Sequence, residues 1–308
     1  MSKIIPYITI ILAMLIWAGS GIAVKEALVV FSPLTLIVLR FTIAVLLMAV
    51  VGLIFHRNEV LQLQRVDTKH ILLFALGGLF QPFLYFIFET YTYQSFDSPT
   101  IAEAMLSTQP IMAPIFAFVL LREQVTANHI WGILISTLGM LILLLVGTND
   151  YSIGNPWGIL LAVLTVCMSV SYTVVLRRIP ARYSSLSIVF YVQAFSLILF
   201  YLVWAVKGEC LEFLHNLPIL LNSTPNLLNS GLAVLYLAVF SSVTAFIFFC
   251  YTVREIGVTR ANIFNNVRPV FTALLMWILF DEHLPLWKWF GIIVIIFGLF
   301  ISQKQRKK

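Results

Sequence analysis

Polar side chains recur at helical spacing inside segments that are otherwise apolar. Gln81, Tyr85, Glu89 and Thr92 follow one another at intervals of four, four and three residues, which places them on one face of a helix. An ionisable group in hydrocarbon is costly unless it is paired or hydrated, so Glu89 marks a functional position. We expect this face to line a polar cavity in which Glu89 takes part in an ion-pair network or binds a coupling proton.

A second polar cluster surrounds a cation in the last third of the chain. Asn262, Asn265 and Asn266 precede Arg268 within an apolar segment. A guanidinium presents a planar fork of donors that matches a carboxylate, so Arg268 is suited to an anionic substrate group or to its gating. A fixed salt bridge is the alternative. The candidate substrate-binding residues are Trp17, Gln81, Tyr85, Glu89, Ser107, Tyr172, Asn262, Asn265, Asn266 and Arg268.

Two kinds of side chain among these candidates have a structural alternative. An aromatic side chain in an apolar segment can serve packing instead of binding, and a serine hydroxyl can bond the backbone of its own helix. The sequence contains no HExxH, P-loop or GxSxG pattern, and its cysteines lack metal-ligand spacing. We therefore expect no enzymatic activity, no cofactor and no metal.

Composition identifies the solvent of these helices. The chain is 61% hydrophobic and only 10% charged, with a mean hydropathy of +0.99. An average soluble domain has about 25% charged residues, so lipid must surround most of this chain. The net charge of +6 does not indicate nucleic acid, because Lys and Arg are spread between the apolar runs. The expected partners are a small-molecule substrate and the lipid bilayer, with no nucleic acid and no obligate protein partner.

Ten apolar runs are long enough to cross a bilayer, which takes about 20 residues each. The sequence thus predicts an all-α integral membrane protein with ten transmembrane helices, joined by loops too short to hold a further domain. The runs lie near 5–25, 34–55, 71–93, 99–121, 129–147, 156–177, 186–206, 230–252, 260–280 and 287–303.

Charged residues in the loops indicate the orientation. With the N-terminus in the cytoplasm, fourteen of the 19 Lys and Arg residues fall in cytoplasmic segments, two in the opposite loops and three in or beside the spans. Because cytoplasmic loops carry an excess of Lys and Arg, this distribution predicts that both termini are cytoplasmic. The expected location is the plasma membrane, as a multi-pass protein of a bacterial inner membrane.

An internal repeat divides the chain into two halves of five spans, 1–148 and 149–308. Five pairs of identical residues are separated by 159 positions, and a weaker repeat at an offset of 153 pairs Lys25 with Arg178 and Arg40 with Gln193. Since five is odd, the second half must enter the membrane inverted, which is typical of alternating-access transporters. The identical pairs are Ala102 and Ala261, Pro110 and Pro269, Glu123 and Glu282, Gly132 and Gly291, and Gly139 and Gly298. For the two repeated glutamates, at helix ends, we expect a structural or capping role.

Several motifs resemble a known family. Residues 17–25, 32–41 and both copies of the repeated block are similar to motifs of the drug/metabolite transporter superfamily, in its EamA-type ten-helix branch. This resemblance implies ten helices and secondary transport, usually export, of amino acids or other metabolites. Glu89 departs from the small residue that the family often has near this position.

Charged residues near the ends of the spans are candidates for gates. Lys25, Arg40, Glu89 and Glu103 fall in the outer part of the first half, and Arg178 and Glu255 lie near the inner face of the second half. We hypothesise that ion pairs among them close each side in turn. The alternative is a static network of ion pairs that only holds the helix ends together.

Three functions remain open. The first is a secondary transporter that works by alternating access, with proton coupling or exchange. The second is a polytopic membrane enzyme acting on lipid intermediates, which the missing catalytic cluster disfavours. The third is a channel or a structural membrane subunit.

Overall fold

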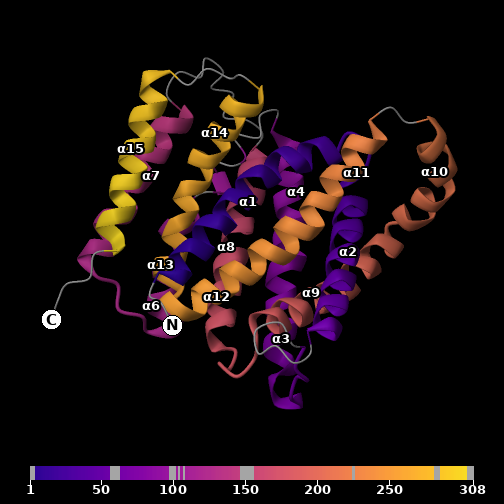
Figure 1. Cartoon of the computed structure of the whole chain (residues 1–308), viewed down its shortest axis with the longest axis horizontal. Helices are drawn as coiled ribbons and strands as arrows, with labels where there is room; N and C mark the ends of the chain where they lie inside the picture. Colours follow the sequence, from indigo (N-terminus) through magenta and orange to yellow (C-terminus); the bar gives the residue numbers. More distant parts are fainter. Residues whose placement is uncertain are drawn as a thin grey trace.

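The structure, a computed structural model, describes residues 4–55, 63–96, 102, 105–106, 108–145, 156–223, 226–280 and 285–303. These residues form helices and turns and contain no strand, so the predicted all-α architecture is confirmed. Figure 1 shows a bundle in which α1 (Ile5–Ala27) begins and α15 (Leu286–Gln303) ends at the same edge.

The first half of the chain contains two long helices and then a series of shorter ones. After α1 these elements are α2 (Pro33–Ile54), a short 3₁₀ turn (Thr68–His70), α3 (Ile71–Gly78), a π-helical turn (Leu79–Leu84), α4 (Tyr85–Ser95), α6 (Gln109–Leu121) and α7 (Ala127–Leu145).

The second half contains a similar series of helices, with α10 inside the predicted loop 207–229. Its elements are α8 (Pro156–Arg178), α9 (Ser185–Val206), α10 (Glu209–Ser223), α11 (Leu227–Tyr236), a π-helical turn (Leu237–Ala245), α12 (Phe246–Ile256), α13 (Val258–Ile263), a 3₁₀ turn (Phe264–Val267), α14 (Arg268–Phe280) and α15.

Six helical segments of the described chain are long and apolar enough to cross a membrane, and three shorter apolar helices accompany them. Large apolar side chains such as Leu53, Phe118 and Phe300 are exposed on their outer faces. Such exposure suits helices that are surrounded by lipid. A multi-pass membrane protein is therefore confirmed, whereas the count of ten spans stays a prediction.

Matching serines begin the second helix of each half. Ser32 precedes α2 and its Oγ accepts a hydrogen bond from the Thr35 amide at 3.3 Å. Ser184 precedes α9 and accepts one from the Ser187 amide at 3.0 Å. Each serine satisfies one of the amides that a helix start leaves without a partner in the helix. The two halves thus use the same capping motif.

Each half also has a π-helical turn within its third apolar stretch. In the first half the turn covers Leu79–Leu84 and contains Pro82, which has no amide hydrogen to donate. Gln81 within it has extended backbone angles, φ −148° and ψ 118°. In the second half the turn covers Leu237–Ala245. π-helical turns redirect side chains and occur often at functional sites.

The glycines of the internal repeat bring α7 and α15 together, side by side in Figure 1. A Cβ atom on Gly132 would lie 2.7 Å from the carbonyl oxygen of Gly298, and one on Gly139 would lie 2.8 Å from that of Gly291. Adding 159 to Gly132 gives Gly291, and subtracting 159 from Gly298 gives Gly139, so exchanging the repeats converts the first contact into the second. The helices therefore cross antiparallel in a self-complementary contact. A twofold relation between the halves produces such a contact, as an inverted repeat requires.

Candidate functional site

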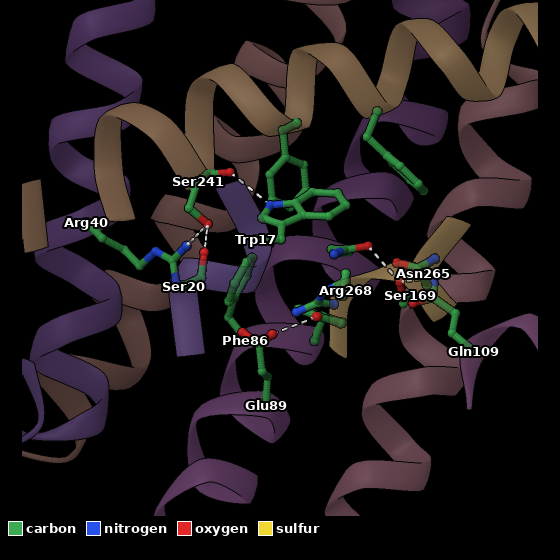
Figure 2. A pocket seen from close by; sticks show the side chains of 14 residues that line it. Trp17, Ser20, Arg40, Phe86, Glu89, Gln109, Ser169, Ser241, Asn265 and Arg268 are labelled. Carbon is green, nitrogen blue, oxygen red and sulfur yellow. Dashed lines mark hydrogen bonds between the residues drawn. The ribbon is translucent and has the colours of Figure 1, made fainter. Parts of the chain in front are cut away.

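A small cavity lies between the two halves (Figure 2). Its wall combines both charges, amides, hydroxyls and aromatic rings from helices of both halves. The lining residues are Trp17, Ser20, Arg40, Gln81, Tyr85, Phe86, Glu89, Gln109, Ser169, Ser241, Phe246, Phe249, Asn265 and Arg268.

One side of the cavity is built where α1 meets the π-helical turn 237–245. The Trp17 indole Nε1 donates to the Ser241 carbonyl oxygen at 3.2 Å. Ser20 Oγ donates to Ser241 Oγ at 2.9 Å. The Trp17 ring lies edge-on to Phe246, with ring centres 5.4 Å apart. These contacts fix an aromatic wall beside a polar one.

Arg40 reaches this side from α2 and is 1% exposed. Its Nε donates to Ser242 Oγ at 3.1 Å, and its Nη2 donates to Ser241 Oγ at 3.2 Å. The guanidinium carbon lies 4.4 Å from the centre of the Phe86 ring, within cation–π range. Hydroxyls and a ring solvate the buried cation but leave its charge in the cavity.

Glu89 supplies the opposite charge. Its side chain is buried, and its Oε1 accepts a hydrogen bond from the Tyr85 hydroxyl at 2.7 Å. Tyr85 and Glu89 are one turn apart on α4, so the predicted polar face of this helix does point into a cavity. Burial of a carboxylate is tolerated where hydrogen bonds and cations compensate it.

The other side of the cavity is a network of neutral polar groups. Gln109, the first residue of α6, donates from Nε2 to Ser169 Oγ at 2.8 Å and to Asn262 Oδ1 at 2.6 Å. Ser169 Oγ donates to Gln81 Oε1 at 3.3 Å. Because Gln81 and Gln109 belong to the first half and Ser169 and Asn262 to the second, the network joins the halves.

Arg268 is the first residue of α14 and is 5% exposed. Its guanidinium carbon lies 5.8 Å from the centre of the Trp17 ring. In Figure 2 it lies between the side formed by Arg40 and Ser241 and the side formed by Gln109 and Ser169. The guanidinium brings a positive charge and a planar fork of donors into this region, so the region favours an anion.

The repeat relates Arg268 to a residue that the sequence analysis did not select. Subtracting 159 from Arg268 gives Gln109, and each precedes a proline, Pro269 and Pro110. Both residues begin a helix and both line the cavity. The offset of 159 was the signal that could have identified Gln109 from the sequence.

The structure brings together most of the predicted binding residues. Trp17, Gln81, Tyr85, Glu89, Asn265 and Arg268 line the cavity.

The remaining predicted binding residues do not line this cavity or cannot be placed. Asn262 bonds the lining residue Gln109. Asn266 Nδ2 donates to Ser136 Oγ on α7 at 2.6 Å. Tyr172 is fully buried and packs on Phe246. Ser107 lies outside the described residues. All ten binding assignments stay predictions.

The predicted gate residues are distributed over several regions. Arg40 and Glu89 line the central cavity. Lys25 Nζ donates to the Phe96 carbonyl oxygen at 2.7 Å, and Arg178 Nη2 donates to the Leu120 carbonyl oxygen at 2.8 Å.

A separate groove contains the remaining described gate candidate, Glu255. It is lined by Arg177, Arg178, Arg254 and Glu255, together with residues of the α8–α9 connection. Glu103 lies outside the described residues. Ion pairing among the gate candidates stays a hypothesis.

No three His, Cys, Asp or Glu side chains within the described ranges are grouped closely enough to hold a metal ion. The groups that the cavity offers for binding are two guanidiniums, one carboxylate, amides, hydroxyls and aromatic rings. These groups suit the recognition of a small polar molecule by charge and hydrogen bonds.

Comparison with known proteins gives a consistent result. An uncharacterized transporter of Archaeoglobus fulgidus is 25% identical over 300 residues, covering 97% of this chain and 99% of the relative. The uncharacterized transporter YetK of Bacillus subtilis is 26% identical, covering 98% of this chain and 88% of the relative. An S-adenosylmethionine/S-adenosylhomocysteine transporter of Chlamydia trachomatis is 25% identical, covering 88% of this chain and 80% of the relative.

A solved crystal structure shares the fold. It superposes with a TM-score of 0.72 at 20% identity and covers 96% of this chain and 97% of its own.

The sequence profile of the EamA-like transporter family matches twice, over residues 4–145 and 156–303. The two matches leave a short gap near the boundary between the predicted halves, and together they account for nearly the whole chain. This chain therefore belongs to the EamA-like transporter family.

Proposed function

We propose that this protein is a secondary transporter of small metabolites that carry both a carboxylate and a cationic group, such as amino acids. The observation that supports this proposal is the cavity between the halves, in which buried Arg268 and Arg40 share a wall with buried Glu89. A zwitterion offers one group to each charge. The export direction follows from the resemblance to the drug/metabolite transporters.

The buried charges divide the recognition task. A substrate carboxylate is placed at Arg268, because the planar guanidinium fork of this residue matches a carboxylate. A substrate ammonium group or the coupling proton is placed at Glu89. Arg40 is held by Ser241 and Ser242 and sets the electrostatic potential of the site.

Alternating access is the proposed mechanism. The cavity space open to the centres of water molecules is about 20 Å³, room for about one or two waters, so a substrate needs the halves to move. In this scheme ten helices form two inverted halves, 1–148 and 149–308, in a bacterial plasma membrane with both termini cytoplasmic. One half rocks against the other around the central site. Enzyme and channel activities are not part of the proposal.

A second candidate substrate comes from the name of the chlamydial relative. S-Adenosylmethionine carries an amino-acid group, a sulfonium and an adenine ring. The same charges would hold the first two, and the aromatic walls formed by Trp17, Phe246 and Phe249 would stack on the ring.

Counterflow in proteoliposomes tests the proposal, with labelled amino acids, S-adenosylmethionine and S-adenosylhomocysteine as the panel. A carrier accumulates labelled substrate transiently against unlabelled substrate inside, and a channel does not. Arg268→Gln should weaken the affinity for carboxylate substrates by roughly ten- to a hundredfold, because charge-assisted hydrogen bonds are lost. Arg268→Lys, which keeps the charge but not the fork, should fall between. Wild-type affinity in folded Arg268→Gln would exclude this role.

Glu89 is tested in the same vesicles with an imposed pH gradient. Glu89→Gln should abolish pH-driven accumulation while substrate exchange continues, because exchange requires no net proton movement. Unchanged accumulation in a well-folded variant would remove Glu89 as a proton site.

A further inference from the structure

α6, which lines the cavity, and α13, which bonds it there, are joined again beyond the end of α6. α6 begins at the cavity with Gln109, whose side chain bonds Asn262 of α13. Beyond the end of α6, the Glu123 carboxylate accepts three hydrogen bonds from the start of α13. The donors are the Val258 amide at 3.1 Å, the Thr259 amide at 3.3 Å and the Thr259 hydroxyl at 3.1 Å. Figure 1 shows α6 and α13 meeting at the edge of the bundle where α1 begins.

Every one of these bonds crosses from one half to the other. Glu123 belongs to the first half, and it provides acceptors for two amides that no residue of their own helix can satisfy. The turn before α13 is adapted to this contact. Gly257 has φ +90°, and a Cβ there would lie 3.2 Å from Glu123 Oε1. A larger residue would strain the turn and crowd the carboxylate.

Further hydrogen bonds join the two halves. Arg178 donates to the Leu120 carbonyl oxygen at the end of α6, at 2.8 Å. A separate clasp joins residues 64–70 to the α8–α9 connection. In it the Gln64 amide donates to Ser187 Oγ at 2.8 Å, and the Ser184 amide donates to Gln64 Oε1 at 2.7 Å.

The clasp also contains an ion pair, between Asp67 and Arg182. Tyr183 strengthens it, since its hydroxyl accepts from the Asp67 amide at 3.1 Å. In the proposed topology residues 64–70, Glu123, the α8–α9 connection and the start of α13 all face the cytoplasm. The described bonds therefore close one face of the molecule by contacts between halves.

We propose that Glu123 is the cytoplasmic gate residue of this transporter. While Glu123 holds Val258 and Thr259, α13 stays against α6 and the path from the cavity to the cytoplasm is closed. Release of these bonds, together with the Asp67–Arg182 clasp, opens that path. The gate rests on the proposed alternating access, and Arg178 contributes to the same face by its hydrogen bond to the Leu120 carbonyl oxygen.

Hydrogen–deuterium exchange of the full-length protein in nanodiscs tests the gate without any substrate. The reporters are five amides that bond across the halves: those of Val258 and Thr259 at Glu123, and those of Gln64, Asp67 and Ser184 in the clasp. Glu123→Gln should speed exchange roughly five- to tenfold at both sets, because opening moves the halves apart. Glu123→Asp, which keeps the charge, should restore much of the protection.

A local cap would behave differently. If Glu123→Gln speeds exchange only at Val258 and Thr259 and leaves the clasp unchanged, Glu123 merely caps α13 and the gate is refuted. Thr126→Ala is the matched control, because it removes a cap at the start of α7 that lies entirely within the first half, where the His129 amide donates to Thr126 Oγ1, and it should leave all five reporters unchanged. If Glu123→Gln does not fold, Thr259→Ala is the second variant, because it removes one of the three hydrogen bonds to Glu123. It should produce a smaller rise in the exchange rate at both sets of amides. No rise at the clasp amides would refute the gate.

The result is independent of the transport assay. If exchange rises at both sets of amides but no tested compound is transported, the gate is supported and the proposed substrate class is wrong. Conversely, transport with an unchanged clasp in Glu123→Gln would retain the transporter and remove the gate.

Discussion

A buried and an exposed arginine are stabilised in different ways in this protein. Arg40 is 1% exposed and is solvated by Ser241, Ser242 and the Phe86 ring. Arg182 lies at the surface and pairs directly with Asp67, with side chains 52% and 43% exposed. Water screens the exposed pair, so its value lies in joining the halves more than in stabilising the fold.

The Asp67–Arg182 pair makes a prediction about pH. The hydrogen bond from the Arg182 guanidinium holds the pKa of the Asp67 carboxyl below its usual value of 3.8. Since the folded pKa is the lower one, the pair stabilises the closed form fully above that usual value and loses its effect as pH falls through the folded pKa. Asp67→Asn should therefore lower the melting temperature by more at about pH 7 than at about pH 3. Equal differences at both pH values, measured in detergent, would contradict the pairing.

At the scale of elements, the two halves differ in chemistry at equivalent positions. Gln109 and Arg268 begin equivalent helices, yet one enters a neutral network and the other presents a cation. Arg40 and Gln193 are likewise related by the weaker repeat, and both bond the π-helical turn 237–245, Gln193 through the Ser242 carbonyl oxygen at 2.5 Å. Duplication kept the positions and changed the groups, so a symmetric scaffold holds an asymmetric site.

The glycine contact between α7 and α15 can be tested by adding one methyl group. Gly298→Ala would place Cβ 2.4 Å from the Ser136 backbone nitrogen, and backbone cannot move aside as a side chain can. We expect a loss of about 1–3 kcal/mol in stability, as overpacking causes. Gly231→Ala is the control, because nothing lies within 4 Å of its added Cβ and it sits in α11. That variant should be neutral or more stable by up to about 1 kcal/mol. Equal melting temperatures for the two variants would contradict the close crossing.

At the scale of the whole molecule, equivalent contacts occur near the starts of α2 and α9. Ser184 and Ser187, at the start of α9, bond Gln64 of the first half. Ser32, at the start of α2, donates to Glu209 Oε2 of the second half at 2.5 Å. The proposed topology assigns the first contact to the cytoplasmic face and the second to the outer face. The residues of each contact therefore lie on the same face in this topology. The starts of α2 and α9 lie on opposite faces, as expected if the second half is inverted relative to the first.

Reporter fusions test this topology directly. A fusion after residue 150 follows five proposed spans, and one after residue 308 follows ten, so the first should report the outer side and the second the cytoplasm. An alkaline phosphatase and a fluorescent protein, each placed at both positions, give complementary readouts. Matching readouts at the two positions would exclude five spans in each half.

Local patterns in the sequence were sufficient for the membrane class and for part of the site. Apolar composition predicted lipid-exposed helices, and the spacing of Gln81, Tyr85 and Glu89 predicted one polar face, which lines the cavity. The repeat at 159 predicted equivalent glycines, which meet in the structure. The capping role expected for Glu123 is also confirmed, although its partner helix was not identified. Each of these features depends on residues close in sequence or on identity at a fixed offset.

Only the tertiary structure decided which helix faces meet. It placed Gln109 in the cavity, Tyr172 in packing and Glu123 on the other half of the chain. A soluble helix reveals its inner face by its apolar side, but a membrane helix is apolar on nearly every side, so its rotation is not encoded in hydrophobic periodicity. Close packing and hydrogen bonds between distant segments select that rotation, and they exist only after the two halves have folded together.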